Sequence, residues 1–142
     1  MLDDKEIHAL ARDVLSREME AAIHQISRAA LIRHFGGVVT PKIWFDGLSG
    51  IDRGTWKGQC RVYVIPGALD INHDAAGCVR PPANWRALVD LAGALGESLA
   101  SGNCNLKPFN AMHSDADIGI VLDVLMAKWD EIQAETKRLL NT

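Results

Sequence analysis

The pair of neighbouring side chains best suited to chemistry in this sequence is His73-Asp74. An imidazole nitrogen beside a carboxylate oxygen can hold a divalent metal ion, or the histidine can serve as a general base. Asp117 follows on a later element, in a segment that begins with His113, and from there it could orient the imidazole. These residues predict a small metal-dependent hydrolase in which His73 and Asp117 are catalytic and Asp74 and His113 bind the metal.

The residues around this pair carry two short resemblances. The segment 68–77, Ala-Leu-Asp-Ile-Asn-His-Asp-Ala-Ala-Gly, loosely resembles the His-Asp segment of HD-domain phosphohydrolases and the His-Asp helix of phospholipase-A2-like enzymes. The first resemblance implies an upstream histidine on a helix, for which His34 or His24 would serve. The second implies that Asp117 orients the imidazole. The strand-like residues 38–65 depart from the all-helical HD fold, and no aromatic residue follows the pair as in the phospholipase pattern. The alternative role for the pair is a cap with a solvent-facing imidazole.

The cysteines allow two further sites. A zinc set could be drawn from His73, Cys78, Cys104 and His113. The ligand types suit zinc, but the spacings match no standard zinc knuckle, and free cysteines commonly pack as small hydrophobic residues. Cys60 could act as a nucleophile with His73 or His113 as its base. Strand alternation favours a core thiol instead, because it places Cys60 on one face with two valines.

Aromatic and basic residues alternate in the middle of the chain. The predicted binding residues are Trp44, Phe45, Arg53, Trp56, Lys57, Arg61 and Tyr63, and Lys42 precedes them. Trp, Tyr and Arg are enriched at protein–protein hot spots, and aromatic faces beside cations also bind nucleotides or single-stranded nucleic acid. The third alternative is that the aromatic rings only pack a small sheet onto helices. The glycines of this segment match neither the P-loop motif nor the GxGxxG motif.

Hydrophobic periodicity and turn residues define the elements that position these groups. We expect an α+β fold that is predominantly α, in which a small two-stranded sheet joins three main helical segments. The helices are expected at 3–35, 82–100 and 115–140, the strands at 38–45 and 60–66, and loops at 46–59 and 103–113.

Local signals set several of these boundaries. Asp3 or Asp4 would cap the first helix, and Gly36 with its neighbour would end it. Ser114 with Asp117 is typical of an N-cap. The first helical segment contains no Gly or Pro, so it forms either one long helix or two with a bend near Ser16. Its apolar stripe is long for so small a core and rich in alanine, which predicts packing against another copy or subunit.

Composition narrows the functional classes. The 142 residues suit one domain, 1–142, whose N-terminal segment 1–37 would extend to a partner. A net charge of −3 lacks the basic surplus that is typical of bulk nucleic-acid binding. No long apolar run predicts a membrane span, and no leader predicts secretion. Three dispersed cysteines indicate a reducing cytoplasm, with a virion as the alternative location. The leading hypothesis is a non-enzymatic binding or assembly subunit, such as a phage or mobile-element accessory protein that forms homo-oligomers. The metal-dependent hydrolase is the first alternative, and a nucleotide or single-stranded nucleic-acid binder is the second.

Overall fold

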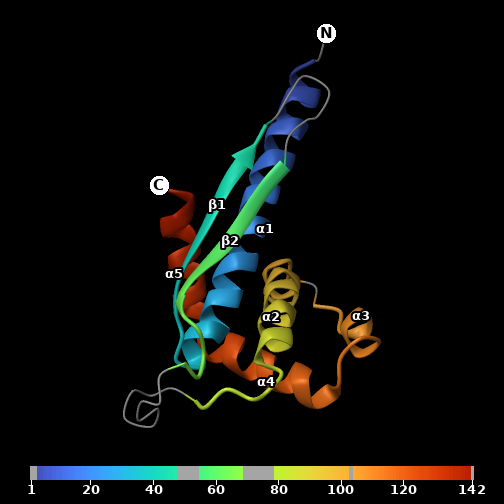
Figure 1. The fold of residues 1–142 in the computed structure, drawn as a ribbon. Coiled ribbons are helices and arrows are strands. Elements are labelled where there is room, and N and C mark those ends of the chain that lie inside the picture. The colour runs from blue at the N-terminus through green and yellow to red at the C-terminus, as the bar shows by residue number, and fades with distance from the viewer. Residues whose placement is uncertain (1–2, 48–54, 69–78, 103, 142) are drawn as a thin grey trace.

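The structure is a computed structural model and describes residues 3–47, 55–68, 79–102 and 104–141, with the backbone alone for 8–16. The elements in order are α1 (Asp4–His34), β1 (Val38–Asp46), β2 (Thr55–Val64), α2 (Trp85–Ala100), α3 (Lys107–Asn110), α4 (Asp115–Ala127) and α5 (Trp129–Leu140). The two strands form one antiparallel sheet, so the predicted α+β class with mostly helical content is confirmed (Figure 1).

The first segment is one continuous helix, α1, without a bend at Ser16. Its start is fixed by a capping box, in which Asp3 accepts from the backbone N–H of Glu6 and Glu6 accepts from that of Asp3. Its end is fixed by Gly36, which takes a φ of 84° that glycine adopts at little cost. At 1.5 Å per residue the helix is about 46 Å long. Its N-terminal end projects beside the hairpin, away from the other helices (Figure 1).

The C-terminal half of α1 lies at the centre of the fold. Strand β1, strand β2, α2, α4 and α5 all contact this helix. Its residues Ala22, Ile26 and Leu31 are completely buried. The helix end is also tied to the chain's C-terminal helix, because Arg33 donates two hydrogen bonds to the carboxylate of Glu135, at 2.8 and 3.1 Å. The alanine-rich stripe from Ala22 onward is therefore covered by the chain itself.

The hairpin is longer than the sequence predicts, because β2 begins at Thr55 instead of residue 60. The glycines of this region predicted a loop, yet Gly58 lies within the strand, opposite Ile43. A Cβ at position 58 would lie 2.5 Å from the Cγ of Gln25 on α1. The glycine thus lets the strand approach the helix closely and does not mark a turn.

Helix α2 also approaches α1 closely. A Cβ at Gly96 would lie 2.6 Å from the Cβ of Ser27 and nearer still to its hydroxyl oxygen. Gly102, with a φ of 76°, follows the helix end as predicted. The start differs from the prediction of residue 82, because the backbone N–H of Trp85 closes a turn onto the carbonyl of Pro82 and the helix begins only there.

The C-terminal helical segment is divided in two, which corrects the single helix expected at 115–140. Lys128 has φ −105° and ψ 7° and separates α4 from α5. Helix α4 packs on α2 and buries Val121, whereas α5 runs along α1 and buries Ile132 (Figure 1). One straight helix could not follow both surfaces. The short helix α3 also lies inside the segment predicted as the loop 103–113.

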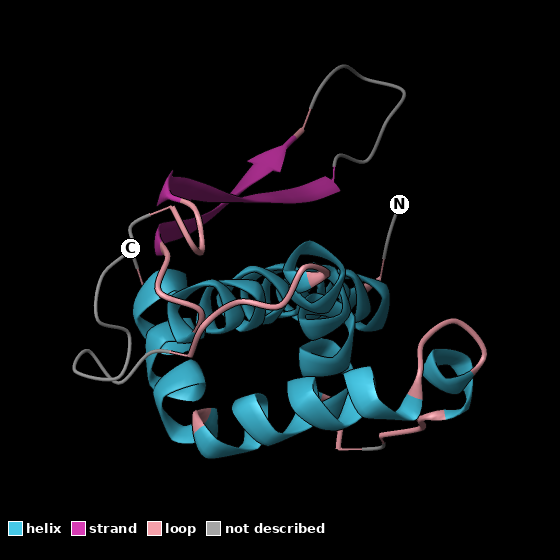
Figure 2. Cartoon of the chain, turned by 60° about the horizontal axis from the view of Figure 1, so that its bottom comes forward, coloured by secondary structure: helices cyan, strands magenta, loops and turns pink. Residues whose placement is uncertain are grey.

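In the layers of the molecule, the hairpin lies on one side of α1 and α2, and α4 lies on the other (Figure 2). The buried core joins α1, α2, α4 and α5 with Val39 of the sheet. Within the described ranges, no helix is both long enough and apolar enough to cross a membrane.

Candidate functional site

The two faces of the hairpin differ sharply in exposure. Six residues of one face, which lies against α1, are buried or half-buried: Val39, Pro41, Ile43, Trp56, Gly58 and Cys60. Phe45 and Val62, at the two ends of this inner face, are exposed. On the other face Asp46 is half-buried and eight residues are exposed: Val38, Thr40, Lys42, Trp44, Lys57, Gln59, Arg61 and Tyr63. We call this second set the outer face. No described helix covers it (Figure 2).

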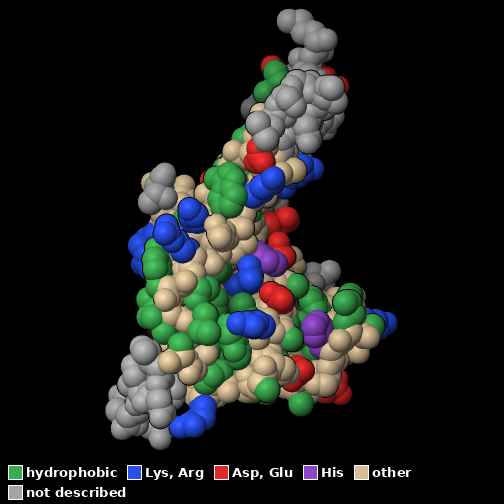
Figure 3. Space-filling model, viewed as in Figure 1, with side chains coloured by type: hydrophobic (Ala, Val, Ile, Leu, Met, Phe, Trp, Pro, Cys, Tyr) green, Lys and Arg blue, Asp and Glu red, His purple; other side chains and the backbone are tan. Residues whose placement is uncertain are grey.

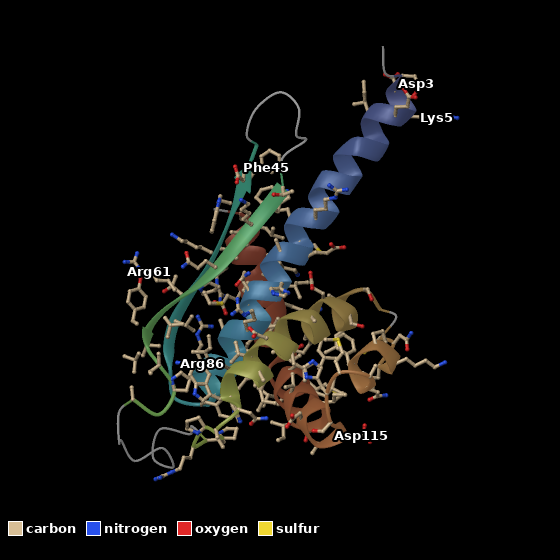
Figure 4. All side chains as sticks on the ribbon, turned by 45° about the vertical axis from the view of Figure 1, so that its right-hand side comes forward. Asp3, Lys5, Phe45, Arg61, Arg86 and Asp115 are labelled. Carbon is tan, nitrogen blue, oxygen red and sulfur yellow. The ribbon has the colours of Figure 1, made fainter. Side chains whose placement is uncertain are left out.

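Four of the seven predicted binding residues lie on the outer face, in two separate pairs. Trp44 stands opposite Lys57 in the strand register, and 41% of its surface is exposed. The Nζ of Lys57 lies 2.6 Å from the Oδ2 of Asp46, so this cation already has a partner. The guanidinium of Arg61 lies 5.4 Å from the ring centre of Tyr63, which is 58% exposed. Figure 4 shows Arg61 pointing away from the helices.

The other three predicted binding residues do not lie there. Phe45 and Trp56 are opposite one another at the far end of the hairpin, with ring centres 5.3 Å apart. Because Trp56 lines a hollow against α1, this pair belongs to the inner side of the sheet. Arg53 lies outside the described residues. The aromatic residues of the segment are thus divided between packing onto α1 and exposure on the outer face.

Apolar residues extend the outer face toward the base of the hairpin. Val38 and Ile65 are 52% and 46% exposed, and Val62, opposite Val39 on the inner face, is also 37% exposed. Figure 3 shows hydrophobic side chains gathered over the lower part of the hairpin and basic side chains above them. The surface therefore offers aromatic and aliphatic contact area beside cations, which is the composition of a protein-binding patch.

The predicted His-Asp site is only partly visible. His73, Asp74 and Cys78 lie outside the described residues. The carboxylate of Asp117 accepts from the side-chain amide of Asn84 at 3.3 Å, and His113 is half-buried in the turn before α4. In the part of the chain that is described, no group of three His, Cys, Asp or Glu side chains could hold a metal ion.

Cys60 is on the inner face of the hairpin, as strand alternation predicts. Its thiol donates to the backbone carbonyl of Gln25 at 3.1 Å. Burial raises the pKa of Cys60 to about 11, against the opposing influence of Arg28 and Arg33. A thiol with this pKa is almost entirely protonated near neutral pH, whereas a nucleophilic cysteine reacts as the thiolate.

One feature that the sequence did not predict is a hollow of about 360 Å³ between α1, β2 and the end of α2. The Nδ1 of His24 lies 3.1 Å from the Oε2 of Glu97 in this hollow. These residues are 73 positions apart, so no local sequence pattern predicts their contact. The lining mixes both signs of charge: Arg17, Glu20, Ala21, His24, Gln25, Thr55, Trp56, Gly58 and Glu97. The carboxylate orients the imidazole, but nothing in the lining selects a substrate.

Comparison with family models, curated proteins and solved structures gave no match to this chain. Its function is therefore inferred from its own residues. Among the described surfaces, the outer face of the hairpin is the best defined.

Proposed function

We propose that the chain is a non-enzymatic binding or assembly subunit that acts through protein–protein contacts on the outer face of the hairpin. The observation that carries this proposal is the presence of two aromatic rings, Trp44 and Tyr63, each about half exposed, on a sheet face that no described helix covers. Half-exposed aromatic rings flanked by arginine are typical hot-spot residues, because a partner can desolvate them over a large area.

The charges of the outer face favour a protein partner over nucleic acid. The face carries three cations, and the carboxylate of Asp46 neutralises one of them, Lys57. Lys42 and Arg61 then provide the basic character of the described surface. Proteins that hold nucleic acid through its backbone make about 6–10 phosphate contacts. Two cations suit a few ion pairs with carboxylates at the rim of a protein interface better.

A subunit of this kind would suit an accessory protein of a phage or mobile element that assembles with other chains. The two cysteines described, Cys60 and Cys104, are both free thiols. This supports a reducing compartment such as the cytoplasm, where thiols stay reduced.

Photo-crosslinking tests the proposal directly. The chain would carry p-benzoylphenylalanine in place of Tyr63 and be irradiated in the cells that naturally produce it. The matched control carries the same group in place of Glu131, an α5 residue whose side chain is 76% exposed. We expect a discrete protein adduct from position 63 that is absent from position 131 and is lost when Trp44→Ser is added.

Two results would overturn the proposal. One is an equal yield of adducts from both positions. The other is adducts with nucleic acid alone, accompanied by tight, salt-dependent binding of a single-stranded oligonucleotide that Trp44→Ser abolishes. The second result would establish the nucleic-acid alternative.

A further inference from the structure

A second uncovered face lies on α4. The buried side of this helix contains Ile118, Val121, Val124 and Leu125. The opposite side is exposed and also mainly apolar, with Ile120 at 42% and Met126 at 67% exposure, and Ala116, Asp123 and Ala127 beside them. A helix that is apolar on all sides is normally buried on all sides. We call the five exposed residues the α4 face.

The α4 face and the outer face of the hairpin complement each other. The α4 face has aliphatic and thioether groups around the exposed carboxylate of Asp123, and Asp115 is exposed at the start of the same helix. The outer face has aromatic rings around exposed cations, of which Arg61 is the nearest to Tyr63. Thioethers pack favourably against aromatic rings, and an arginine and a carboxylate form a charge-assisted hydrogen bond. A helix is also the usual element to cover the free face of a sheet.

The two faces cannot meet within one molecule, because the hairpin lies on one side of α1 and α2 and α4 lies on the other (Figure 2). We therefore propose that the outer face of one copy binds the α4 face of a second copy. The inference rests on the proposed function and names the partner of the same surface.

The signs of charge favour this contact between unlike faces over a contact between like ones. Two hairpins packed face to face would bring two basic faces together. Two α4 faces packed together would place Asp123 against itself. Like charges across an interface cost free energy, whereas the mixed contact brings the carboxylate of Asp123 against the cations of the outer face. A contact between different faces leaves one face of each type free, so it can extend to further copies.

Complementation between two variants tests the inference. One variant, Arg61→Glu/Tyr63→Ser, loses the outer face, and the other, Ile120→Glu/Met126→Ser, loses the α4 face. Ile7→Ser is the matched control, because Ile7 is 51% exposed at the distant end of α1. All the substituted residues are exposed, so circular dichroism should show each variant folded. Loss of a hot spot weakens an interface about 30-fold.

Light scattering gives the readout. We expect the parent chain and the control to associate as concentration rises, each variant alone to remain monomeric, and an equimolar mixture of the two variants to regain association through its one intact pair of faces. A monomeric parent chain, a variant that associates like the parent, or a mixture that stays monomeric would each overturn the inference. A crosslink from position 63 to a different protein would overturn it too, while leaving the proposed function intact.

Discussion

Replacement of Gly96 by alanine measures how closely α1 and α2 must approach. In an exposed helix interior, Gly→Ala stabilises by about 1 kcal/mol, because alanine loses less backbone entropy. At position 96 the added methyl group would meet Ser27, which is fully buried on α1, at a Cβ–Cβ distance of 2.6 Å. Each helix backbone fixes the position of its Cβ atom, so a rotamer change cannot relieve the Cβ–Cβ clash. Overpacking of this kind costs about 1–3 kcal/mol, and here the upper end applies.

The two effects leave Gly96→Ala destabilised by about 2 kcal/mol, which should lower Tm by roughly 4–8 °C in a chain of this size. Gly119→Ala is the matched control, because Gly119 is also helical and a Cβ there meets nothing within 4 Å. We expect this control to be stabilised by about 0.5–1 kcal/mol. Urea unfolding followed by far-UV circular dichroism gives both values.

A second substitution on the opposite helix should restore the space. Ser27→Gly removes the atoms that the new methyl group meets, and the hydroxyl that it deletes is buried without a hydrogen-bond partner among the described residues. The double variant Ser27→Gly/Gly96→Ala should therefore be more stable than the sum of the single changes by about 1–2 kcal/mol. If Gly96→Ala is as stable as Gly119→Ala, or if the effects of Ser27→Gly and Gly96→Ala are additive, then position 96 does not need a glycine for close approach of the helices.

Three further predictions concern single side chains. Ser114→Ala should lower the free energy of unfolding by about 1 kcal/mol, because the Ser114 hydroxyl accepts from the backbone N–H of Asp117. Ser114→Asp should retain the cap, so equal losses for the two variants in urea unfolding would contradict this prediction. Iodoacetamide at pH 8 should label the exposed Cys104 rapidly and Cys60 slowly, as mapped by peptide mass spectrometry, because the pKa of Cys60 is about 11; similar rates would show that Cys60 does not face α1. Burial, and then the charge of a nearby lysine, lower the pKa of His34 below 6.5, so the unfolded chain takes up this proton first and stability should fall as pH decreases below 6.5. The free energy of unfolding across a pH series should fall less steeply in His34→Gln, and an unchanged slope would remove His34 as the cause.

The parts of the fold that the sequence predicted correctly depend on short-range chemistry. The caps at Asp3 and Ser114 and the helix ends before Gly36 and Gly102 each involve groups within four residues of one another. Such interactions are available to the chain before any tertiary contact forms, and residue type reports them directly.

The errors arose where distant contacts override local preference. Gly58 resembles a turn residue until the helix that it touches is known, because Gln25 lies 33 positions away in the chain. The break at Lys128 has no glycine or proline to mark it, since it follows from the two different surfaces that α4 and α5 cover.

In the candidate site, too, local pattern predicts some features and long-range contacts determine the others. Alternation within each strand separates Trp44 from Phe45, but only the strand register reveals which residues share a face. The register places Trp56 beside Phe45 on the inner side and leaves Trp44, Arg61 and Tyr63 outside. Composition predicted that this segment binds a partner, yet it could not distinguish the residues that pack onto α1 from those left free.

The double hydrogen bond between Arg33 and Glu135 joins residues that are 102 positions apart. Helix α1 is thus completed by a helix that is synthesised about 100 residues later. Until α5 has left the ribosome, one apolar side of α1 has no covering element, and the partly made chain exposes residues that bind chaperones or other nascent chains. Products that stop before α5 should therefore aggregate even though most of this fold is present, and the fold should gain its stability abruptly as the turns of α5 emerge.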